Sequence, residues 1–569
     1  MRPRPTLRHG LLIMVMMQML VGFAVRAQQP EPNGGGNKDL DESFDIVKDY
    51  KPKLSDAEKL PIQPRQEEPQ EAAIQMNYPL ETDPADAPGR NARASAYEGG
   101  TQTREEALFR HRLRLGAGNL GTFQGTYEYS SRRARDYALT GHLRHRSGRG
   151  PVEDLSSFSN NALGVSGRKL LPQEVGLRGD LSYRREVVHY YGFRENQAIP
   201  EAVDAEDIAQ RFNHIHVKGG VFRSNRDPEA APVHWESDIQ YHRFSDDYES
   251  SEGDLQLDAQ VRLPHDETAI YGDFRYRNLG YRYDEEVDFS RHILALGGGY
   301  RWQDGPWNFQ AGARLATVLQ TQDDAFFVYP DLSVEYAIRP GEQLLAYGRL
   351  GGGLQPQSMR SLARRNPFIQ TTPLTLANTS ENIDVDGGVR GAFNAEWSFD
   401  LSAGFSLYSD FPYFLNDAAT QGRQFVLRYD SSSTSRFRIG ASVLYEAPRL
   451  FDFYFRPEFL VYQPGDLEVA AHYPGFRLAS GATYYLGEKI AVALHATVLG
   501  AREAASTEAP DEAIDLDGFA DLGLNARYRF SRYLTASLRV NNLLGQEYQY
   551  WNQYPVRGFQ ALGGLGLRY

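Results

Sequence analysis

The chain has 569 residues and a formal net charge of −13, with 34 Tyr, 30 Phe, 53 Gly and no Cys. The acidic balance gives no support to nucleic-acid binding, and the absence of Cys excludes disulfides and a lipid-anchored Cys. Beyond the N-terminus no apolar run reaches about 20 residues, the length of a transmembrane helix. Mean hydropathy is negative although strand-like segments recur, as in porin-like barrels, where only every second residue of a strand meets lipid.

The first 27 residues have the pattern of a secretory signal peptide. A basic start, an apolar stretch and a small-residue cleavage site follow one another: Arg2, Arg4 and Arg8, then Leu11 to Val25, then Val25-Arg26-Ala27. A membrane anchor is the alternative interpretation, but the apolar stretch is short for one. We therefore expect export, with residues 1–27 removed from the mature chain.

Residues 28–104 are rich in Pro, Gly, Glu and Asp and have little periodic apolar pattern. Such a composition buries too little apolar surface to offset the entropy of ordering, so we expect an extended or disordered periplasmic segment. One part of it, residues 44–52, alternates imperfectly from Phe44 and Ile46 onward. It ends at Pro52, which disfavours helix at the preceding residue, so this part should be extended.

From residue 105 to residue 569 the pattern changes to long alternating segments separated by turn residues. In residues 521–530, one face carries Leu, Ala, Tyr and Phe, and the other carries Asp, Gly, Asn and Arg. Period-two alternation with one apolar face predicts a β-strand with one wet side. A water-soluble sandwich shows the same alternation, but Arg and Asp deep inside long strands fit a polar lumen and a lipid-facing exterior better. The sequence predicts an all-β, transmembrane antiparallel barrel.

The alternating segments number about 22, an even count that suits a single-chain barrel with both ends at the periplasm. This count treats residues 422–447 as one long, bulged strand. Short turns such as Gly487-Glu488-Lys489 and Ser531-Arg532 then alternate with longer connections such as residues 355–381 and 501–517. Short periplasmic turns with longer outer loops are the expected asymmetry of an outer-membrane barrel.

The last forty residues resemble the end of TonB-dependent receptor barrels. Residues 540–548 (VNNLLGQEY) are similar to the N-L-F/L-x-x-x-Y element that opens the final hairpin of these barrels. Leu565, Leu567 and terminal Tyr569 share one face, which resembles the closing-strand signal read by the barrel-assembly machinery. Residues 44–61 are similar to an N-terminal element of receptor-like barrels in the Bacteroidetes. The resemblance implies a receptor barrel over residues 105–569.

One feature departs from that family. Ordinary members carry a large plug domain inside the barrel, whereas only a short, Pro-rich and charged stretch lies here between Gln28 and the first strand. We therefore expect a plug-less variant. A barrel of this size encloses a wide lumen, which the N-terminal segment, an inward-folded loop such as residues 355–381, or a partner protein must fill.

The segment around Phe44, Ile46 and Val47 resembles the energy-coupling box of these receptors in place and texture. Extended segments bind by adding a strand to an exposed sheet edge, and the resemblance implies a TonB-type periplasmic protein as the partner. The alternative is a disordered tether that only spaces the barrel from the signal peptide.

Two pairs of carboxylates look like fragments of calcium loops, Asp384 with Asp386 and Asp515 with Asp517. Both pairs lack the full twelve-residue loop with a distal Glu, so we favour pairing with Arg on the lumenal face at strand starts. The basic run of Arg360, Arg364 and Arg365 lies in the longest predicted outer loop. A solvated loop is favoured there over a site for lipopolysaccharide phosphate or an anionic ligand.

His214 and His216 lie two apart on a predicted strand and so share one face, as metal ligands would. No third His is close in sequence, so we favour polar lining of the lumen. Aromatic pairs near strand ends, among them Tyr190-Tyr191, fit an interface girdle, and Tyr550 with Trp551 has sugar stacking as an alternative.

No nucleophile, base and oxyanion donor occur in recognisable order, and no Gly-rich phosphate loop precedes a helix. We therefore predict no catalytic, cofactor or metal site and no enzyme. The predicted function is uptake or transport across the Gram-negative cell outer membrane, and the alternative is a non-transporting scaffold or subunit of an outer-membrane complex. Expected partners are outer-membrane lipids and lipopolysaccharide, the barrel-assembly machinery, and either the TonB-type protein or another outer-membrane subunit.

Overall fold

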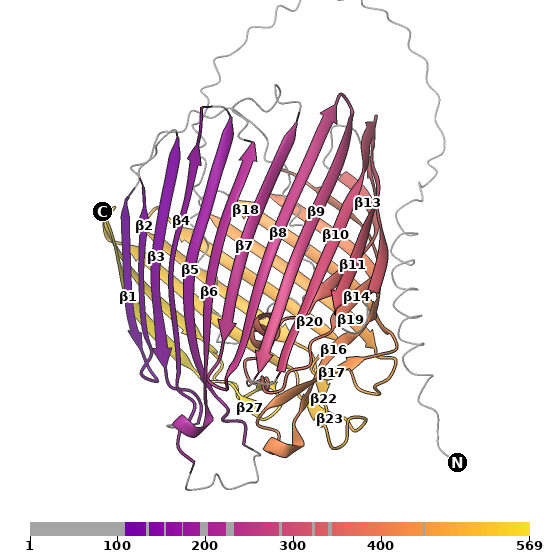
Figure 1. Ribbon diagram of the computed structural model, residues 1–569. Helices are drawn as coiled ribbons and strands as arrows, with labels where there is room; N and C mark the ends of the chain where they lie inside the picture. Colours follow the sequence, from indigo (N-terminus) through magenta and orange to yellow (C-terminus); the bar gives the residue numbers. More distant parts are fainter. Residues whose placement is uncertain are drawn as a thin grey trace, which may run out of the picture. The chain divides into compact units, whose positions relative to one another are not determined.

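The alternating segments form strands that hydrogen-bond into one antiparallel sheet of 22 strands, seen in a computed structural model of the chain (Figure 1). The structure describes residues 109–131, 136–152, 155–172, 174–193, 203–223, 233–283, 287–320, 325–338, 344–447 and 450–569. β1 (His111–Gly118) pairs with β2 (Phe123–Ser130) on one side and with β28 (Gln560–Arg568) on the other, so the sheet closes as a barrel. The predicted all-β barrel of about 22 strands is confirmed.

Successive strands are neighbours in the barrel wall. The other wall strands are β3 (Tyr137–Gly148), β4 (Phe158–Leu170), β5 (Val175–His189), β6 (Ala209–Arg223), β7 (His234–Ser245), β8 (Ser250–His265), β9 (Thr268–Tyr283), β10 (Val287–Asp304), β11 (Trp307–Gln320), β12 (Ala325–Ala337), β13 (Leu344–Pro356), β14 (Asn378–Ala392), β15 (Trp397–Ser409), β18 (Thr434–Ala447), β19 (Phe451–Gln463), β20 (Phe476–Leu486), β21 (Ile490–Leu499), β24 (Phe519–Arg529) and β25 (Leu534–Asn541). Three hairpins lie outside the wall: β16 (Phe411–Asn416) with β17 (Phe425–Asp430), β22 (Arg502–Ala504) with β23 (Ile514–Leu516), and β26 (Gln549–Trp551) with β27 (Tyr554–Pro555). Among the described residues no helix has the length and apolar character needed to cross a membrane.

Each wall strand turns an apolar face outward and a polar face inward. Outward side chains such as Leu296 and Leu565 remain 57% and 59% exposed, which suits contact with lipid because soluble proteins rarely expose large apolar surfaces. Inward side chains pair by charge, as in the 2.5 Å contact between Arg349 Nη2 and Asp384 Oδ2. Alternation along the strands therefore separates a lipid face from a charged lumen.

A pair of glycines leaves room for one lumenal side chain to span two neighbouring strands on the inner face of the wall. Gly299 of β10 lies opposite Gly312 of β11, and Tyr271 of β9 reaches over both to donate from its hydroxyl to Asp331 Oδ2 of β12 at 2.8 Å. A Cβ on either glycine would collide with the Tyr271 hydroxyl. The two glycines thus permit a hydrogen bond that ties β9 to β12.

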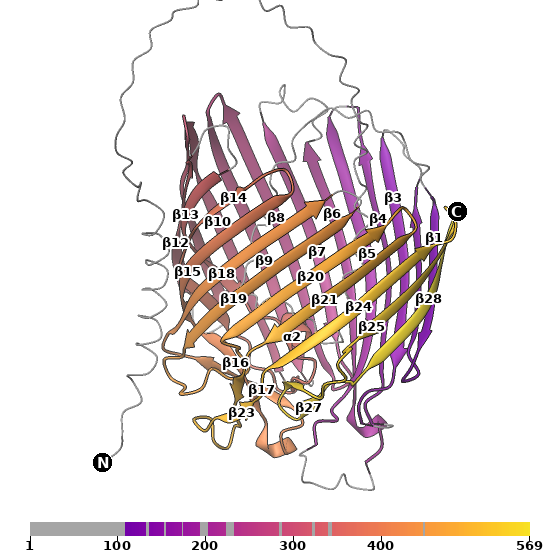
Figure 2. The same cartoon turned by 180° about the vertical axis from the view of Figure 1, so that it is seen from behind.

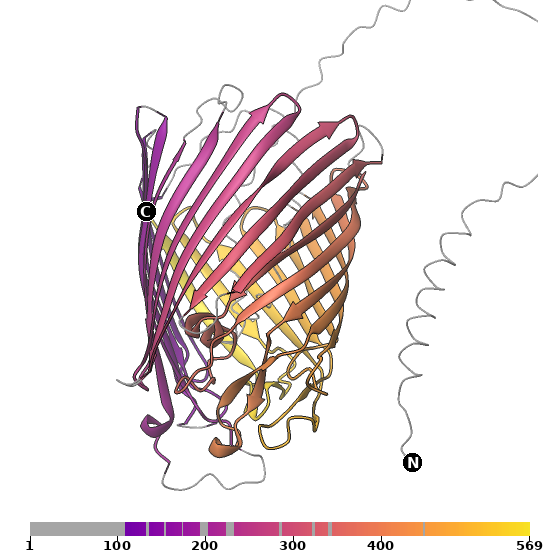
Figure 3. The same cartoon turned by 45° about the vertical axis from the view of Figure 1, so that its right-hand side comes forward.

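The two ends of the barrel differ in their connections. One end, which we call the turn end, carries Tyr569 and short turns such as residues 266–267, 305–306 and 487–489. The opposite cap end carries the three hairpins and the helix α2 (Met359–Arg365), which Figure 2 labels against the wall near this end and Figure 3 shows from the side. The predicted alternation of short and long connections is present, although residues 119–122 form a short turn at the cap end.

The prediction of one strand over residues 422–447 is wrong. β17 pairs with β16 outside the wall, and only β18 joins the wall, between β15 and β19. The strand ends at Asp430. Its buried carboxylate accepts hydrogen bonds from Thr434 Oγ1 at 2.6 Å and from the N–H of Gly465 at 2.7 Å. The total of 22 is right because only one of the two segments lies in the wall.

Candidate functional site

The connection between β13 and β14, residues 357–377, folds into the lumen at the cap end, and we call it the inner loop. Its helix α2 begins with a capping box, in which the backbone N–H of Ser361 donates to Ser358 Oγ at 3.1 Å and that of Ser358 donates to Ser361 Oγ at 3.0 Å. Met359 and Leu362 of α2 are fully buried. Of the three candidates predicted to fill the lumen, an inward-folded loop is therefore present.

Charged side chains of the wall hold α2 in place. Glu252 Oε2 of β8 accepts from the backbone N–H of Met359 at 2.5 Å. Asp254, fully buried two residues further along β8, is paired with Arg360 of α2 at 3.2 Å and with Arg277 of β9 at 2.8 Å. Burial lowers the pKa of Arg360, and the charges of Glu252 and Asp254 oppose this effect. The helix is thus attached by buried, charge-assisted hydrogen bonds.

A buried arginine joins the two ends of the inner loop. Arg291 of β10 is fully buried, donates from Nη1 to the carbonyl of Ala377 at 3.0 Å, and donates from Nη2 to the carbonyl of Gln357. The N–H of Gln357 also donates to the carbonyl of Ala377 at 3.1 Å. The loop therefore enters and leaves the lumen at one fixed point on the wall.

The inner loop packs under a set of cap-end segments that we call the cap (residues 410–433, 464–475, 500–518 and 542–559). Phe425 of β17 exchanges backbone hydrogen bonds with the inner loop, donating to Phe368 at 3.0 Å and accepting from Gln370 at 2.7 Å. The Phe368 ring stacks on Tyr554 with centroids 3.5 Å apart, and Trp551 lies edge-on to Phe425 at 5.4 Å. These aromatic rings belong to the buried apolar cluster that closes the cap end.

Burial shifts the pKa of two titratable groups at the cap end. Asp246, in the turn between β7 and β8, accepts from the Thr371 hydroxyl of the inner loop and from Gln210 Nε2 at 3.1 Å. Burial raises the pKa of Asp246, although these hydrogen bonds oppose the effect. Burial and the charge of Arg502 lower the pKa of His472 to about 3, so its ring is neutral at pH 7. The packing of the cap therefore favours the neutral form of the His472 ring.

The lumenal face below the inner loop carries three histidines. His214 and His216 of β6 share that face as predicted, and His242 of β7 stands beside them, with 3.1 Å between His214 Nε2 and His242 Nδ1. The rings of His216 and His242 stack at 4.3 Å. No group of ligands suited to a metal ion occurs among the described residues. The geometry fits polar lining of the lumen.

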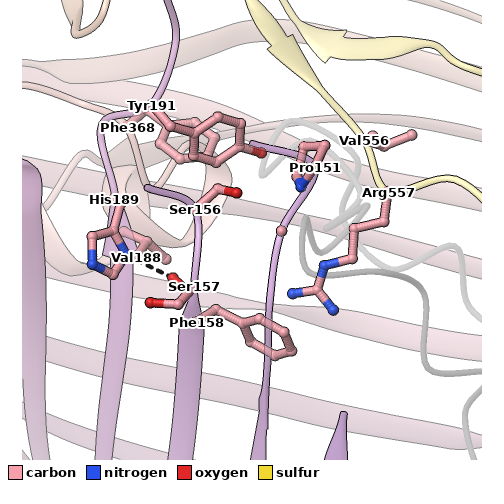
Figure 4. A pocket seen from close by; sticks show the side chains of 11 residues that line it. Pro151, Ser156, Ser157, Phe158, Val188, His189, Tyr191, Phe368, Val556 and Arg557 are labelled. Carbon is pink, nitrogen blue, oxygen red and sulfur yellow. Dashed lines mark hydrogen bonds between the residues drawn. The ribbon is translucent and has the colours of Figure 1, made fainter. Parts of the chain in front are cut away.

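A pocket of about 420 Å³, counting its open mouth, lies where the inner loop meets the wall (Figure 4). Tyr191 and Phe368 form one side, and Phe158 and Arg557 form the other. The Arg557 guanidinium lies 3.7 Å from the centre of the Phe158 ring. Any group entering here would meet aromatic faces and one cation.

The structure places the predicted closing-strand residues at the seam of the barrel. Leu565 and Leu567 face outward opposite Leu115 and Leu113 of β1, and the backbone of Tyr569 exchanges hydrogen bonds of 3.0 Å with His111. Their role in assembly stays a prediction. Phe44, Ile46 and Val47 lie outside the described residues, as do residues 1–108 altogether, so the signal peptide, the coupling segment and the expected lack of a plug also stay predictions.

Other predicted polar groups divide into two outcomes. Asp384 and Asp386 are lumenal and pair with Arg349 and Arg438, as expected, although they lie in the middle of β14 and not at its start. Asp515 and Asp517 are not lumenal strand residues, because they lie exposed in a cap connection that precedes β24.

Two further expectations are corrected. The basic run is not a solvated loop as a whole: the side chain of Arg360 is 14% exposed in the lumen, and Arg365 donates to the hydroxyl of Tyr473, whereas Arg364 is exposed. Tyr190 and Trp551 are buried in the core under the cap, so they belong neither to a girdle nor to a sugar platform. Packing among long connections, which has no local signature, explains both errors.

The residues that hold the inner loop were missed by the sequence reasoning. Glu252, Asp254, Arg277 and Arg291 all occupy inward positions of strands, and inward charges are ordinary in a polar lumen. The sequence signal for this site was that several charged residues share the inward positions of the three adjacent strands β8 to β10. Alternation shows that a charge faces inward but does not name its partner.

No family model and no curated protein matches the sequence. Solved structures match the fold. The FrpB iron transporter from Neisseria meningitidis (F3-3 variant) has a TM-score of 0.64 at 7% identity, with 82% of each chain covered. The ferric-catecholate import receptor Fiu from E. coli K12 has a TM-score of 0.62 at 10% identity, and the copper transporter OprC has 0.61 at 12%, both with 82% of each chain covered.

These structures are TonB-dependent receptors, so the barrel of this chain has the fold of that class of outer-membrane protein. Their names describe transporters and receptors. At these identities the likeness is one of fold alone.

Proposed function

We propose that the protein is an outer-membrane receptor that takes up a solute across the outer membrane of a Gram-negative cell. The observation that carries this proposal is a closed barrel with a charged lumen, whose cap end is occupied by a loop held by ion pairs and hydrogen bonds. Such a loop is releasable, because each of these contacts can be exchanged for contacts with water or a ligand. The fold shared with iron and copper transporters supports the same proposal.

In this proposal the cap end faces outside and the turn end faces the periplasm, since short turns are periplasmic in outer-membrane barrels. The signal peptide of residues 1–27 exports the chain, the barrel-assembly machinery inserts it, and the outward face meets lipid and lipopolysaccharide. A TonB-type protein binds residues 44–52 from the periplasmic side and supplies energy for release of the inner loop.

Uptake by whole cells tests the proposal. Cells that produce the intact chain should accumulate radiolabelled iron–catecholate complex or copper faster than cells without it, the two probes being chosen from the similar structures. Deleting residues 44–52 should abolish the difference while leaving the barrel in the membrane. Equal accumulation in all three strains, for both probes, would contradict uptake of these solutes.

The second candidate is a non-transporting subunit of an outer-membrane complex, and the extensive aromatic packing under the cap favours it, because a permanently closed barrel needs no gate. Purification in mild detergent distinguishes the two. The scaffold is supported if an outer-membrane partner copurifies in stoichiometric amount and cells with and without the chain take up the probes equally. Cross-linking of residues 44–52 to a TonB-type protein supports the receptor.

A further inference from the structure

A second, smaller pocket lies in the lumenal wall at the cap end, beside the seam of β1 and β28; we call it the oxyanion pocket. Its polar lining comes from Thr122, Gln124, Arg146, Arg539, Asn541 and Gln560. None of the described residues that line it is an Asp or a Glu. The pocket is small, with a volume of about 280 Å³ when its open mouth is counted. It therefore suits a small ion or one group of a larger solute.

A buried hydroxyl points to a missing partner in the oxyanion pocket. Thr122 is 8% exposed, and its Oγ1 has no hydrogen-bond partner among the described residues. Buried polar groups are nearly always hydrogen-bonded in native proteins, because an unpaired one loses its bonds to water without compensation. A bound acceptor in the pocket would restore the hydrogen bond of the Thr122 hydroxyl.

The charge of the pocket is positive and is not neutralised at Arg146. Within the described part of the chain the side chain of Arg146 makes no hydrogen bond or ion pair, and its guanidinium carbon lies 5.5 Å from the centre of the Phe158 ring. Arg539 and Arg557 both repel it electrostatically. Several other lumenal arginines face carboxylates, as Arg390 faces Glu335 at 2.6 Å. Arg146 is therefore a cation with room for an anion.

The neighbouring amides complete the lining. Arg539 donates from Nη1 to Gln124 Oε1 at 3.3 Å, which fixes the direction of the Gln124 side chain. Gln560 is 5% exposed and donates from Nε2 to the carbonyl of Gly558 at 3.3 Å. The pocket thus combines the guanidinium groups of Arg146 and Arg539, one hydroxyl donor and orienting amides on the strands of the wall.

We propose that the oxyanion pocket binds a single oxyanion group, a carboxylate or a phosphate, between the guanidinium of Arg146 and the hydroxyl of Thr122. A planar guanidinium binds two oxygens of such a group at once, and the Thr122 hydroxyl donates to the remaining oxygen or to one of the two. The site does not depend on transport, because the pocket is formed by the closed barrel. It applies equally to a receptor and to a scaffold.

Calorimetric titration of the full chain in detergent tests the site, with inorganic phosphate and acetate as probes at constant ionic strength set by chloride. We expect saturable binding of at least one probe. Arg146→Gln should weaken binding at least tenfold, and Thr122→Val, which keeps the shape and removes the hydroxyl, at least threefold. Arg144→Gln is the matched control, since Arg144 is the preceding inward residue of β3, is 59% exposed and does not line the pocket. Its effect should be less than twofold.

The outcomes separate the sources of the oxyanion. Binding of phosphate alone assigns a phosphate site, binding of acetate alone a carboxylate site, and binding of both a general oxyanion site. If Arg146→Gln does not insert as a heat-modifiable barrel, Thr122→Val carries the test. Absence of saturable binding by the intact chain, or equal effects of the Arg144 and Arg146 variants, overturns the proposal. If the intact chain binds a probe but its presence does not increase uptake by cells, only the proposed function is contradicted.

Discussion

Arg360 of α2 and Asp254 of β8, separated by 106 positions in the sequence, form an ion pair of 3.2 Å in which the carboxylate is fully buried. Asp254 also holds Arg277, so one wall carboxylate binds both the inner loop and the adjacent strand. A buried charge that loses its partner is expensive, and this makes the pair a strong fastening for the loop and also a point where its release can be triggered.

Replacing Asp254 should therefore loosen the inner loop. We expect Asp254→Ala to destabilise the loop by about 3 kcal/mol, because it leaves two arginines without their buried partner. The measurement is conductance in planar bilayers, where the variant should open more often than the intact chain. Asp258→Ala is the control, since its partner Arg275 is 57% exposed and such a pair contributes less than about 1 kcal/mol. Equal conductance of the two variants would contradict the role of Asp254.

The cap should weaken on acidification through His472. Its pKa of about 3 in the folded state lies below the ordinary value of 6.5, so the unfolded chain takes up the proton first. The stabilising contribution is therefore present above pH 6.5 and is lost as the pH falls from 6.5 toward 3. Because the His472 ring lies 4.9 Å from that of Trp551, Trp551 fluorescence should report the change. His472→Gln should flatten this titration and Trp551→Phe should remove the signal; an unchanged profile in His472→Gln would exclude His472 as its origin.

Changes to Tyr569 should impair insertion of the barrel. Tyr569 ends the closing strand at the seam, with its ring stacked on His111 at 4.7 Å and more than half of its surface exposed on the outside. Tyr569→Asp, or deletion of the residue, removes the apolar anchor of the last strand. Surface yield and heat-modifiability should both fall, whereas Tyr569→Phe should leave them unchanged. Normal yield of Tyr569→Asp would show that the strand is recognised by other residues.

A methyl group at Gly312 should disturb the strut between β9 and β12. Gly312→Ala places a Cβ against both the Tyr271 hydroxyl and the backbone carbonyl of Gly298, so it should displace the hydroxyl from Asp331 and shift β10, at a cost of about 1–3 kcal/mol. The midpoint of thermal unfolding on heat-modifiability gels should fall accordingly. Gly563→Ala is the control, because no atom lies within 4 Å of a Cβ there. Equal midpoints for the two variants would show that the strut adds little.

The wall of the barrel could be predicted from the sequence because lipid and lumen impose alternation residue by residue. The outward Leu565 and the inward Asp384 are each fixed by their parity within a strand, and no knowledge of distant partners is required. The error at residues 422–447 has the same origin. β17 alternates like a wall strand, and the turn that separates it from β18 depends on Asp430 binding Gly465, a contact between segments far apart in the chain.

The candidate site was less predictable. The inner loop was one of three candidates for filling the lumen, but the basic run within it was assigned to solvent. Whether Arg360 meets water or Asp254 depends on which way a long connection folds, and composition is the same in both cases. Likewise, the place of His242 beside His214 and His216 could not be predicted, because it depends on the register of β6 and β7, which sets His242 opposite His216.

The pairing of β1 with β28 joins parts of the chain that are far apart, as the hydrogen bond between Asn119 and Phe559, separated by 440 positions, shows directly. Closing such a long intervening segment carries a large entropic cost before any contact repays it. β1 has only one partner, β2, until β28 is in place, and its free edge is a template for pairing with other chains. The protein must therefore remain unfolded and guarded from aggregation until β28 is available, and the lifetime of that state decides its yield as much as the stability of the finished wall.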